Sequence, residues 1–236
     1  MHRRNTLVPG VVVAIAAIAL VSWAATATSA APATVAHASH TATLSLEKQI
    51  TFRNAMGKYW EDHITWTRLF VISALSDSPD LPQTTQRLLQ NQVDIGDAIK
   101  PYYGDAAGNQ LTALLRDHIL IAADVVAAAR AGDTTALSAH MARWQANADQ
   151  IGDFLGAANP DQWPADEMKA MMRQHLDLTT AEVVARLKQD WPGDVAAYDR
   201  VHLHILVLAD DLANGIVAQF PAAFEEPTQA ALEGAE

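Results

Sequence analysis

Three histidines stand at the same place in three short stretches of the chain. The stretches are Trp60-Glu-Asp-His63-Ile, Leu115-Arg-Asp-His118-Ile and Met172-Arg-Gln-His175-Leu. Read at helical spacing, each histidine falls within a stripe of apolar side chains, which is the side of a helix that turns toward a core. A neutral imidazole is a common ligand for zinc, copper and iron in proteins. The pattern therefore indicates buried histidines that could bind a transition metal.

Three further segments carry a polar residue in the apolar stripe. Asn91, Asn147 and His204 each stand six residues before an aspartate, and Glu182 lies in the stripe two turns after His175. A buried polar group without a partner costs about 1–3 kcal/mol, so these side chains must satisfy one another, water or a ligand. We expect them to form one network inside the fold.

The predicted site is a metal centre for zinc, copper or iron, with a small polar molecule as the alternative ligand. Its expected metal ligands are His63, His118, His175, His204 and Glu182. We expect the amides of Asn91 and Asn147 to orient the imidazoles by holding the remaining ring N–H groups. Arg68 is expected near the site, where it could instead neutralise Glu182 in a buried ion pair.

A structural reading of the same residues stays open. A His–Asn pair can close a hydrogen-bond network that specifies helix packing without any ligand, as in a non-catalytic envelope or protein-interaction domain. We assign no catalytic residues, because Glu-x-x-His, His-Glu-x-x-His, Gly-x-Ser-x-Gly and glycine-rich phosphate-loop motifs are all missing. A binding or structural protein is favoured over an enzyme. A metal-dependent enzyme would need an open coordination position and a substrate cleft.

The elements that would position these residues are helices. Helical periodicity alternates with short breaks rich in Pro, Gly, Asn and Asp, and no run is typical of a strand. The pattern predicts an all-α domain over residues 46–220. It would be a closed six-helix bundle of three antiparallel hairpins related by a weak three-fold internal repeat. The expected helices span 47–76, 83–99, 107–131, 134–157, 164–189 and 194–219.

The first residues are typical of an export signal. Basic residues at 2–4, an apolar run at 11–25 and the small residues Thr28-Ser29-Ala30 predict a signal peptide over residues 1–30. An uncleaved membrane anchor is the alternative. Residues 31–45 are expected to be a flexible spacer and residues 221–236 an acidic, disordered tail. We therefore expect a periplasmic, envelope or extracellular protein, which would be membrane-associated only if the first segment stays attached.

The amino-acid composition excludes some classes of binding partner and of metal ligand. The chain has 16 Lys and Arg against 27 Asp and Glu, a net charge of −11, and no cysteine. Without Arg3 and Arg4 a mature chain would carry 14 basic and 27 acidic side chains, a net charge of −13. Nucleic acid is excluded as an expected partner, because phosphate binding needs clustered basic residues. Disulfides and thiolate metal ligands are impossible.

Five longer strings contain most of these residues. They are Trp60-Glu-Asp-His-Ile-Thr-Trp-Thr-Arg68, Asn91-Gln-Val-Asp94, Arg116-Asp-His-Ile-Leu-Ile-Ala122, Trp144-Gln-Ala-Asn-Ala148 and His175-Leu-Asp-Leu-Thr-Thr-Ala-Glu182. Together they resemble the motifs of a family of small bacterial all-helical proteins. The resemblance spans about residues 46–220 and implies that these motifs belong to one fold. It implies no activity.

Overall fold

The computed structural model describes residues 44–226, and all of its regular structure is helical. The expected signal peptide, nearly all of the spacer and the last ten residues of the tail lie outside these residues. The helices are α1 (Leu46–Ser76), α2 (Leu81–Ala131), α3 (Thr134–Ala158), α4 (Ala165–Leu187), α5 (Trp191–Gln219) and the short 3-10 helix η1 (Pro221–Phe224). The expected all-α class is confirmed.

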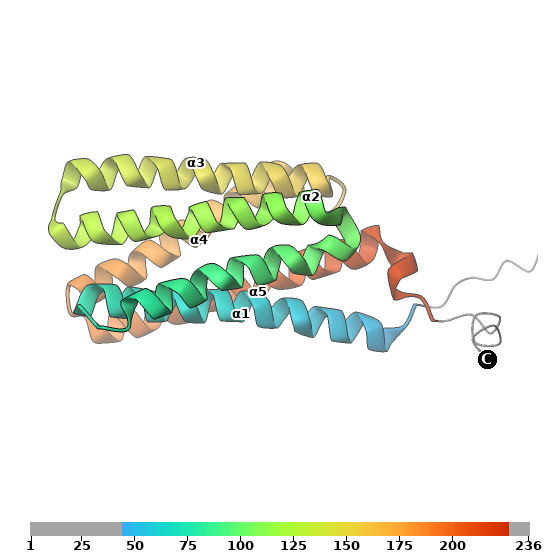
Figure 1. Cartoon of the computed structure of the whole chain (residues 1–236), viewed down its shortest axis with the longest axis horizontal. Coiled ribbons are helices and arrows are strands. Elements are labelled where there is room, and N and C mark those ends of the chain that lie inside the picture. The colour runs from blue at the N-terminus through green and yellow to red at the C-terminus, as the bar shows by residue number, and fades with distance from the viewer. Residues whose placement is uncertain (1–43, 227–236) are drawn as a thin grey trace, which may run out of the picture. The chain divides into compact units, whose positions relative to one another are not determined.

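Helix α2 differs from the prediction, because it contains both the second and the third expected helix. The structure therefore has five α-helices within the described residues instead of six. Pro101 interrupts the hydrogen-bond ladder of α2, and Gly104 has φ 82° and ψ 168°, a conformation that residues with a Cβ rarely adopt. Figure 1 shows the green ribbon of α2 running in one direction, turning sharply and returning. The helix is thus bent into two arms without a separate loop.

Two glycines let the arms of α2 approach each other. A Cβ built on Gly96 would lie 2.6 Å from the carbonyl oxygen of Gly108, and a Cβ on Gly108 would lie 2.6 Å from that of Gly96. Larger residues would push the arms apart. The Arg116 guanidinium of the second arm also donates to the Leu89 carbonyl of the first, at 3.3 Å.

The ends of the helices follow local capping chemistry. The side chains of Ser45, Asp133 and Asp190 accept hydrogen bonds from backbone N–H groups at the starts of α1, α3 and α5. At the other ends, Asp77 after α1 and Gly132 after α2 adopt the left-handed conformation that stops a helix. Asp77, Gly132, Asp133 and Asp190 lie in the breaks predicted from the sequence, and Ser45 is the last residue of the expected spacer.

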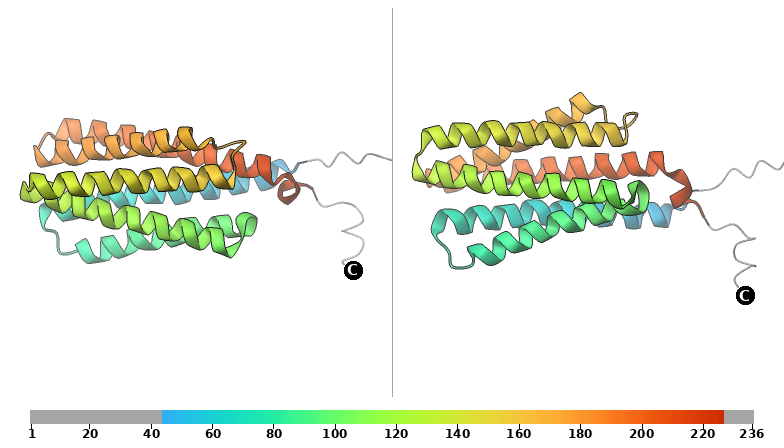
Figure 2. Two further views of the ribbon diagram at one scale, coloured as in Figure 1. Left: turned by 90° about the horizontal axis from the view of Figure 1, so that it is seen from above. Right: turned by 45° about the horizontal axis from the view of Figure 1, so that its top comes forward.

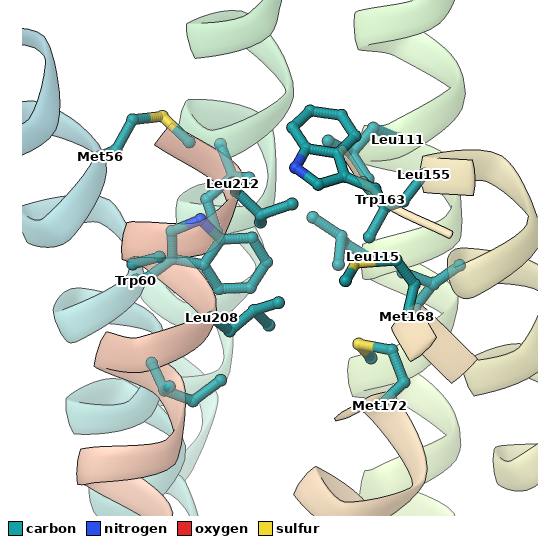
Figure 3. Packing of buried hydrophobic residues seen from close by; sticks show 14 of the residues in the cluster. Met56, Trp60, Leu111, Leu115, Leu155, Trp163, Met168, Met172, Leu208 and Leu212 are labelled. Atoms are coloured by element: carbon teal, nitrogen blue, oxygen red, sulfur yellow. The ribbon is translucent and has the colours of Figure 1, made fainter. Parts of the chain in front are cut away.

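The five helices pack in a closed ring around a main core and a smaller apolar cluster, which consists of Phe70, Val71, Leu88, Ile119, Val126 and Val183. Each helix contacts the next in the chain, and α5 returns to contact α1, an arrangement that the two views of Figure 2 also show. In Figure 3, Trp60 and Leu208 face Met168 and Met172 across the core. Helix α5 is long and apolar enough to cross a membrane, but half of its most apolar window is buried in the bundle, as in the central helix of a packed domain.

The two ends of the described chain meet beside η1. Leu44 and Glu225 form an isolated antiparallel bridge, and the Ser45 N–H donates to the Phe224 carbonyl at 2.6 Å. Phe224 is 2 % exposed and packs against the core. The residues expected to begin a solvated tail at 221 therefore start with an ordered helical turn.

Candidate metal centre

The bundle brings four histidines from four helices together. His63 of α1, His118 of α2 and His175 of α4 are only 2–3 % exposed, and His204 of α5 is partly buried. The ring centroid of His175 lies 5.8 Å from that of His63, 5.9 Å from that of His118 and 6.2 Å from that of His204. His175 is therefore the centre of the cluster.

The hydrogen bonds of His118 define which of its nitrogens carries the proton. The Asn147 side-chain amide donates to the Leu114 carbonyl at 3.1 Å, so the amide oxygen is the atom that faces the ring, at 2.8 Å from His118 Nδ1. Nδ1 must then carry the hydrogen and donate it. The lone pair lies on Nε2, which is buried and has no hydrogen-bond partner.

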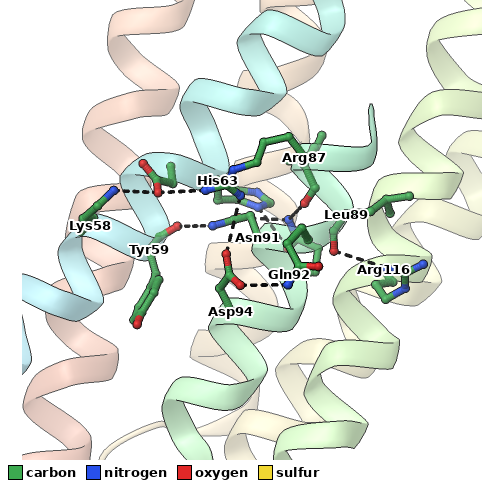
Figure 4. A network of polar contacts seen from close by, with 12 residues as sticks. Lys58, Tyr59, His63, Arg87, Leu89, Asn91, Gln92, Asp94 and Arg116 are labelled. Atoms are coloured by element: carbon green, nitrogen blue, oxygen red, sulfur yellow. Dashed lines mark hydrogen bonds and ion pairs between the residues drawn. The ribbon is translucent and has the colours of Figure 1, made fainter. Parts of the chain in front are cut away.

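His63 is oriented in the same way, by Gln92 rather than by the expected Asn91. The Gln92 amide donates to the Leu88 carbonyl and to Asn91 Oδ1, and its oxygen lies 3.3 Å from His63 Nδ1 (Figure 4). His63 therefore donates from Nδ1 and keeps a lone pair on Nε2. Asn91 does not contact His63. It accepts a hydrogen bond from Gln92, and its own amide donates to the Tyr59 carbonyl at 2.9 Å.

The other two histidines complete the cluster. His204 Nε2 lies 3.0 Å from the Met171 carbonyl oxygen, so Nε2 carries the hydrogen and Nδ1 the lone pair. His175 Nδ1 is buried without a hydrogen-bond partner. Among the described residues, two buried imidazole nitrogens of neighbouring rings thus lack partners, which is costly unless a ligand satisfies them.

Burial keeps these imidazoles neutral near pH 7. Desolvation, aided by the proximity of His118, lowers the pKa of His63 to about 3. Desolvation lowers the pKa of His118 to about 4 against the smaller opposing effect of Asn147. It holds the pKa of His175 well below the usual value and lowers that of His204. Neutral imidazole is the form that binds metals, so no proton has to be displaced.

The three ring distances from His175 are each wider than the distance between two imidazoles that share one metal ion. Two imidazoles on one ion have centroids about 5–5.5 Å apart, since the metal–nitrogen bond is about 2.0–2.1 Å. Within residues 44–226 no set of three or more His, Asp or Glu side chains is already arranged to hold an ion. Metal binding would therefore require the histidine rings to move toward one point.

The carboxylate of Glu182 has a different partner. It is fully buried, and its Oε1 accepts a hydrogen bond from the Arg68 guanidinium at 2.8 Å. Arg68 also forms a two-bond pair with Asp194, which Arg186 contacts as well at 2.8 Å. Burial raises the pKa of Glu182, while Arg68 opposes the shift. The geometry matches the alternative prediction, in which Arg68 rather than a metal ion neutralises Glu182 in a buried ion pair.

Two residues of these networks were missed by reasoning from sequence. Gln92 adjoins Asn91, and a glutamine beside an inward asparagine is ordinarily expected at the edge of the buried face. Asp194 stands in the first turn of α5, where an acidic residue is common for reasons of helix polarity alone. A signal for Gln92 was its spacing of 29 residues from His63, which equals that between His118 and Asn147.

Comparisons with known proteins identify no relative. No protein-family model matches the chain, and neither the curated proteins nor the solved structures include a significantly similar one. No family model therefore supports the resemblance that the sequence motifs indicate. The function has to be argued from the geometry of the site.

Proposed function

We propose that this protein binds one transition-metal ion through His63, His118 and His175, with His204 as a fourth ligand. The observation that carries the proposal is the orientation of the rings. Three of the four imidazoles donate one N–H to an oxygen of the protein, which leaves a lone pair on the opposite nitrogen. Histidine ligands of metal sites are almost always held in this way, because the outer hydrogen bond selects the tautomer and increases ligand basicity.

The donor set favours an ion that accepts nitrogen ligands. Zinc, copper and iron suit neutral imidazoles, whereas calcium and magnesium prefer oxygen ligands. Glu182 is left out of the proposed ligand set, because Arg68 already holds it. The arrangement suits storage, buffering or delivery of a metal ion by an exported protein, in keeping with the signal-like segment expected over residues 1–30.

An internal repeat would account for the symmetry of the cluster. We infer that three hairpins derive from one unit, with α2 contributing an arm to each of the first two. This is supported by equivalent hydrogen bonds, in which Asn91, Asn147 and His204 each bond the carbonyl four residues before the histidine of their hairpin. The six helical segments of the expected bundle would be these three pairs.

Titration of metal into the untagged full-length protein tests the proposal. We expect chelator-treated protein to bind one zinc or copper ion per chain by calorimetry and elemental analysis. His175→Leu should abolish this binding, because it removes the ring that neighbours the other three. The matched control is His140→Leu on α3, whose ring takes no part in the cluster and which should bind as the wild type does.

A second candidate function is supported by the same hydrogen bonds. Side-chain amides that bond backbone carbonyls of a neighbouring helix specify helix register, so the network could serve packing alone in an envelope domain. Under that reading, zinc, copper and iron would leave the melting temperature of metal-free protein unchanged. His175→Leu would then alter no binding property.

A further inference from the structure

A cavity of about 140 Å³ adjoins the histidine cluster, between α1, α2, α3 and α4. The rings of His63, His118 and His175 line one part of it. The rest is lined mainly by apolar side chains, together with three threonines: Phe70, Val125, Val126, Trp144, Val183, Thr67, Thr179 and Thr180. Interiors are normally packed with few voids larger than a water molecule. A hollow of this size inside a closed bundle is therefore a feature to be explained.

The cavity is unsuited to water, because its accessible wall consists almost entirely of carbon atoms. The Nδ1 atoms of His63 and His118 face Gln92 and Asn147, and the hydroxyls of Thr67 and Thr179 donate to the carbonyls of His63 and His175. A buried water needs two to four polar partners, and apolar cavities of about 150 Å³ in proteins stay dry and take up benzene or xenon. The wall thus favours an uncharged apolar occupant.

We propose that this cavity binds a small uncharged apolar molecule of about the size of benzene. The ligand lies between the valines and the rings of His118 and Trp144, which offer flat aromatic contacts. Leu137 and Met141 are only partly buried, and Val184 is 38 % exposed, so the cavity reaches toward the surface between α3 and α4. These residues provide the route of entry.

The inference goes beyond metal binding and is tested without metal. Benzene, added near its solubility limit to chelator-treated full-length protein, should raise the melting temperature by about 2–4 °C. Benzoate, which has the same ring with a charged group, should give no rise, because the cavity offers its carboxylate no partner. Absence of a rise with benzene in the wild-type protein would overturn the proposal.

Larger side chains that fill the cavity can be compared with the same substitution made outside it. Ala122→Leu and Ala129→Leu, two turns apart on the lining face of α2, should abolish the benzene-dependent rise. Ala142→Leu makes the same change on the exposed side of α3 and should keep the full rise. If the rise persists in a folded filling variant, benzene binds elsewhere and the assignment is wrong. Metal titration is read on the wild-type protein, separately from the benzene-dependent rise, so failure of one proposal leaves the other standing.

Discussion

At the scale of residues, the protein keeps several imidazoles neutral in its interior. The folded-state pKa of His63 is about 3 and that of His118 about 4, whereas both are near 6.5 when exposed. Between these values the unfolded chain binds more protons than the folded chain. The free energy of unfolding therefore decreases as the pH falls through this interval, and it is greatest above pH 6.5.

This linkage predicts acid sensitivity that begins before carboxylates titrate. Urea unfolding of metal-free protein should show lower stability at pH 5 than at pH 7.5, by up to about 1.4 kcal/mol per pH unit for each buried imidazole. His175→Leu removes one such group and should flatten the dependence. Equal stability at the two pH values would show that the rings are not held neutral.

The buried ion pair beside the cluster predicts a large effect for one arginine. Arg68→Met leaves the fully buried carboxylate of Glu182 without its cation and should cost about 3–5 kcal/mol in urea unfolding. Arg173→Met breaks an exposed pair with Asp149 and should cost less than about 1 kcal/mol. The double variant Arg68→Met/Glu182→Leu should recover part of the loss, because Asp194 also loses Arg68 and keeps only Arg186. A small effect of Arg68→Met alone would mean that Glu182 is satisfied in another way.

Individual site residues show which features could be predicted from the sequence and which could not. His63, His118 and His175 were predicted to be buried because they fall in apolar stripes, and the structure buries all three. Periodicity gives direction but no distance, so it could not tell that Gln92 rather than Asn91 contacts His63. Nor could it choose between a metal and Arg68 as the partner of Glu182, since both satisfy a carboxylate.

At the scale of elements, the turn inside α2 makes the site possible. It returns the chain so that His118 lies beside histidines from α1 and α4. Proline and glycine in residues 101–109 predicted a break here. The break is conformational rather than a loop, because Gly104 alone leaves the helical region and hydrogen bonding resumes at once. Sequence could place the interruption, but it could not predict that the two arms would join directly at Gly104.

Two glycine substitutions test the turn. Gly104→Ala should destabilise the protein by about 1–3 kcal/mol, because φ 82° and ψ 168° lie in a region that is essentially restricted to glycine. Gly57→Ala in α1 places the same methyl group in open space on a regular helix, and it should stabilise by about 0.5–1 kcal/mol. Thermal and urea unfolding would measure both. If both variants behaved alike, the turn would not depend on its glycine.

At the scale of the whole molecule, a closed ring of helices surrounds neutral histidines within an acidic chain. The net charge of −11 attracts cations to surface carboxylates without specificity, so uptake of metal alone is a weak criterion. Specific binding has to be recognised by its ligands. A metal ion bound in the interior would have imidazole nitrogens as ligands, whereas an ion bound at the surface would have carboxylate oxygens.

X-ray absorption spectroscopy of the zinc-loaded full-length protein makes this distinction most directly. The account predicts a coordination shell dominated by three or four imidazole nitrogens at about 2.0–2.1 Å, which His175→Leu should remove and His140→Leu should retain. A shell of oxygen ligands, or an imidazole signal that survives in His175→Leu, would contradict it.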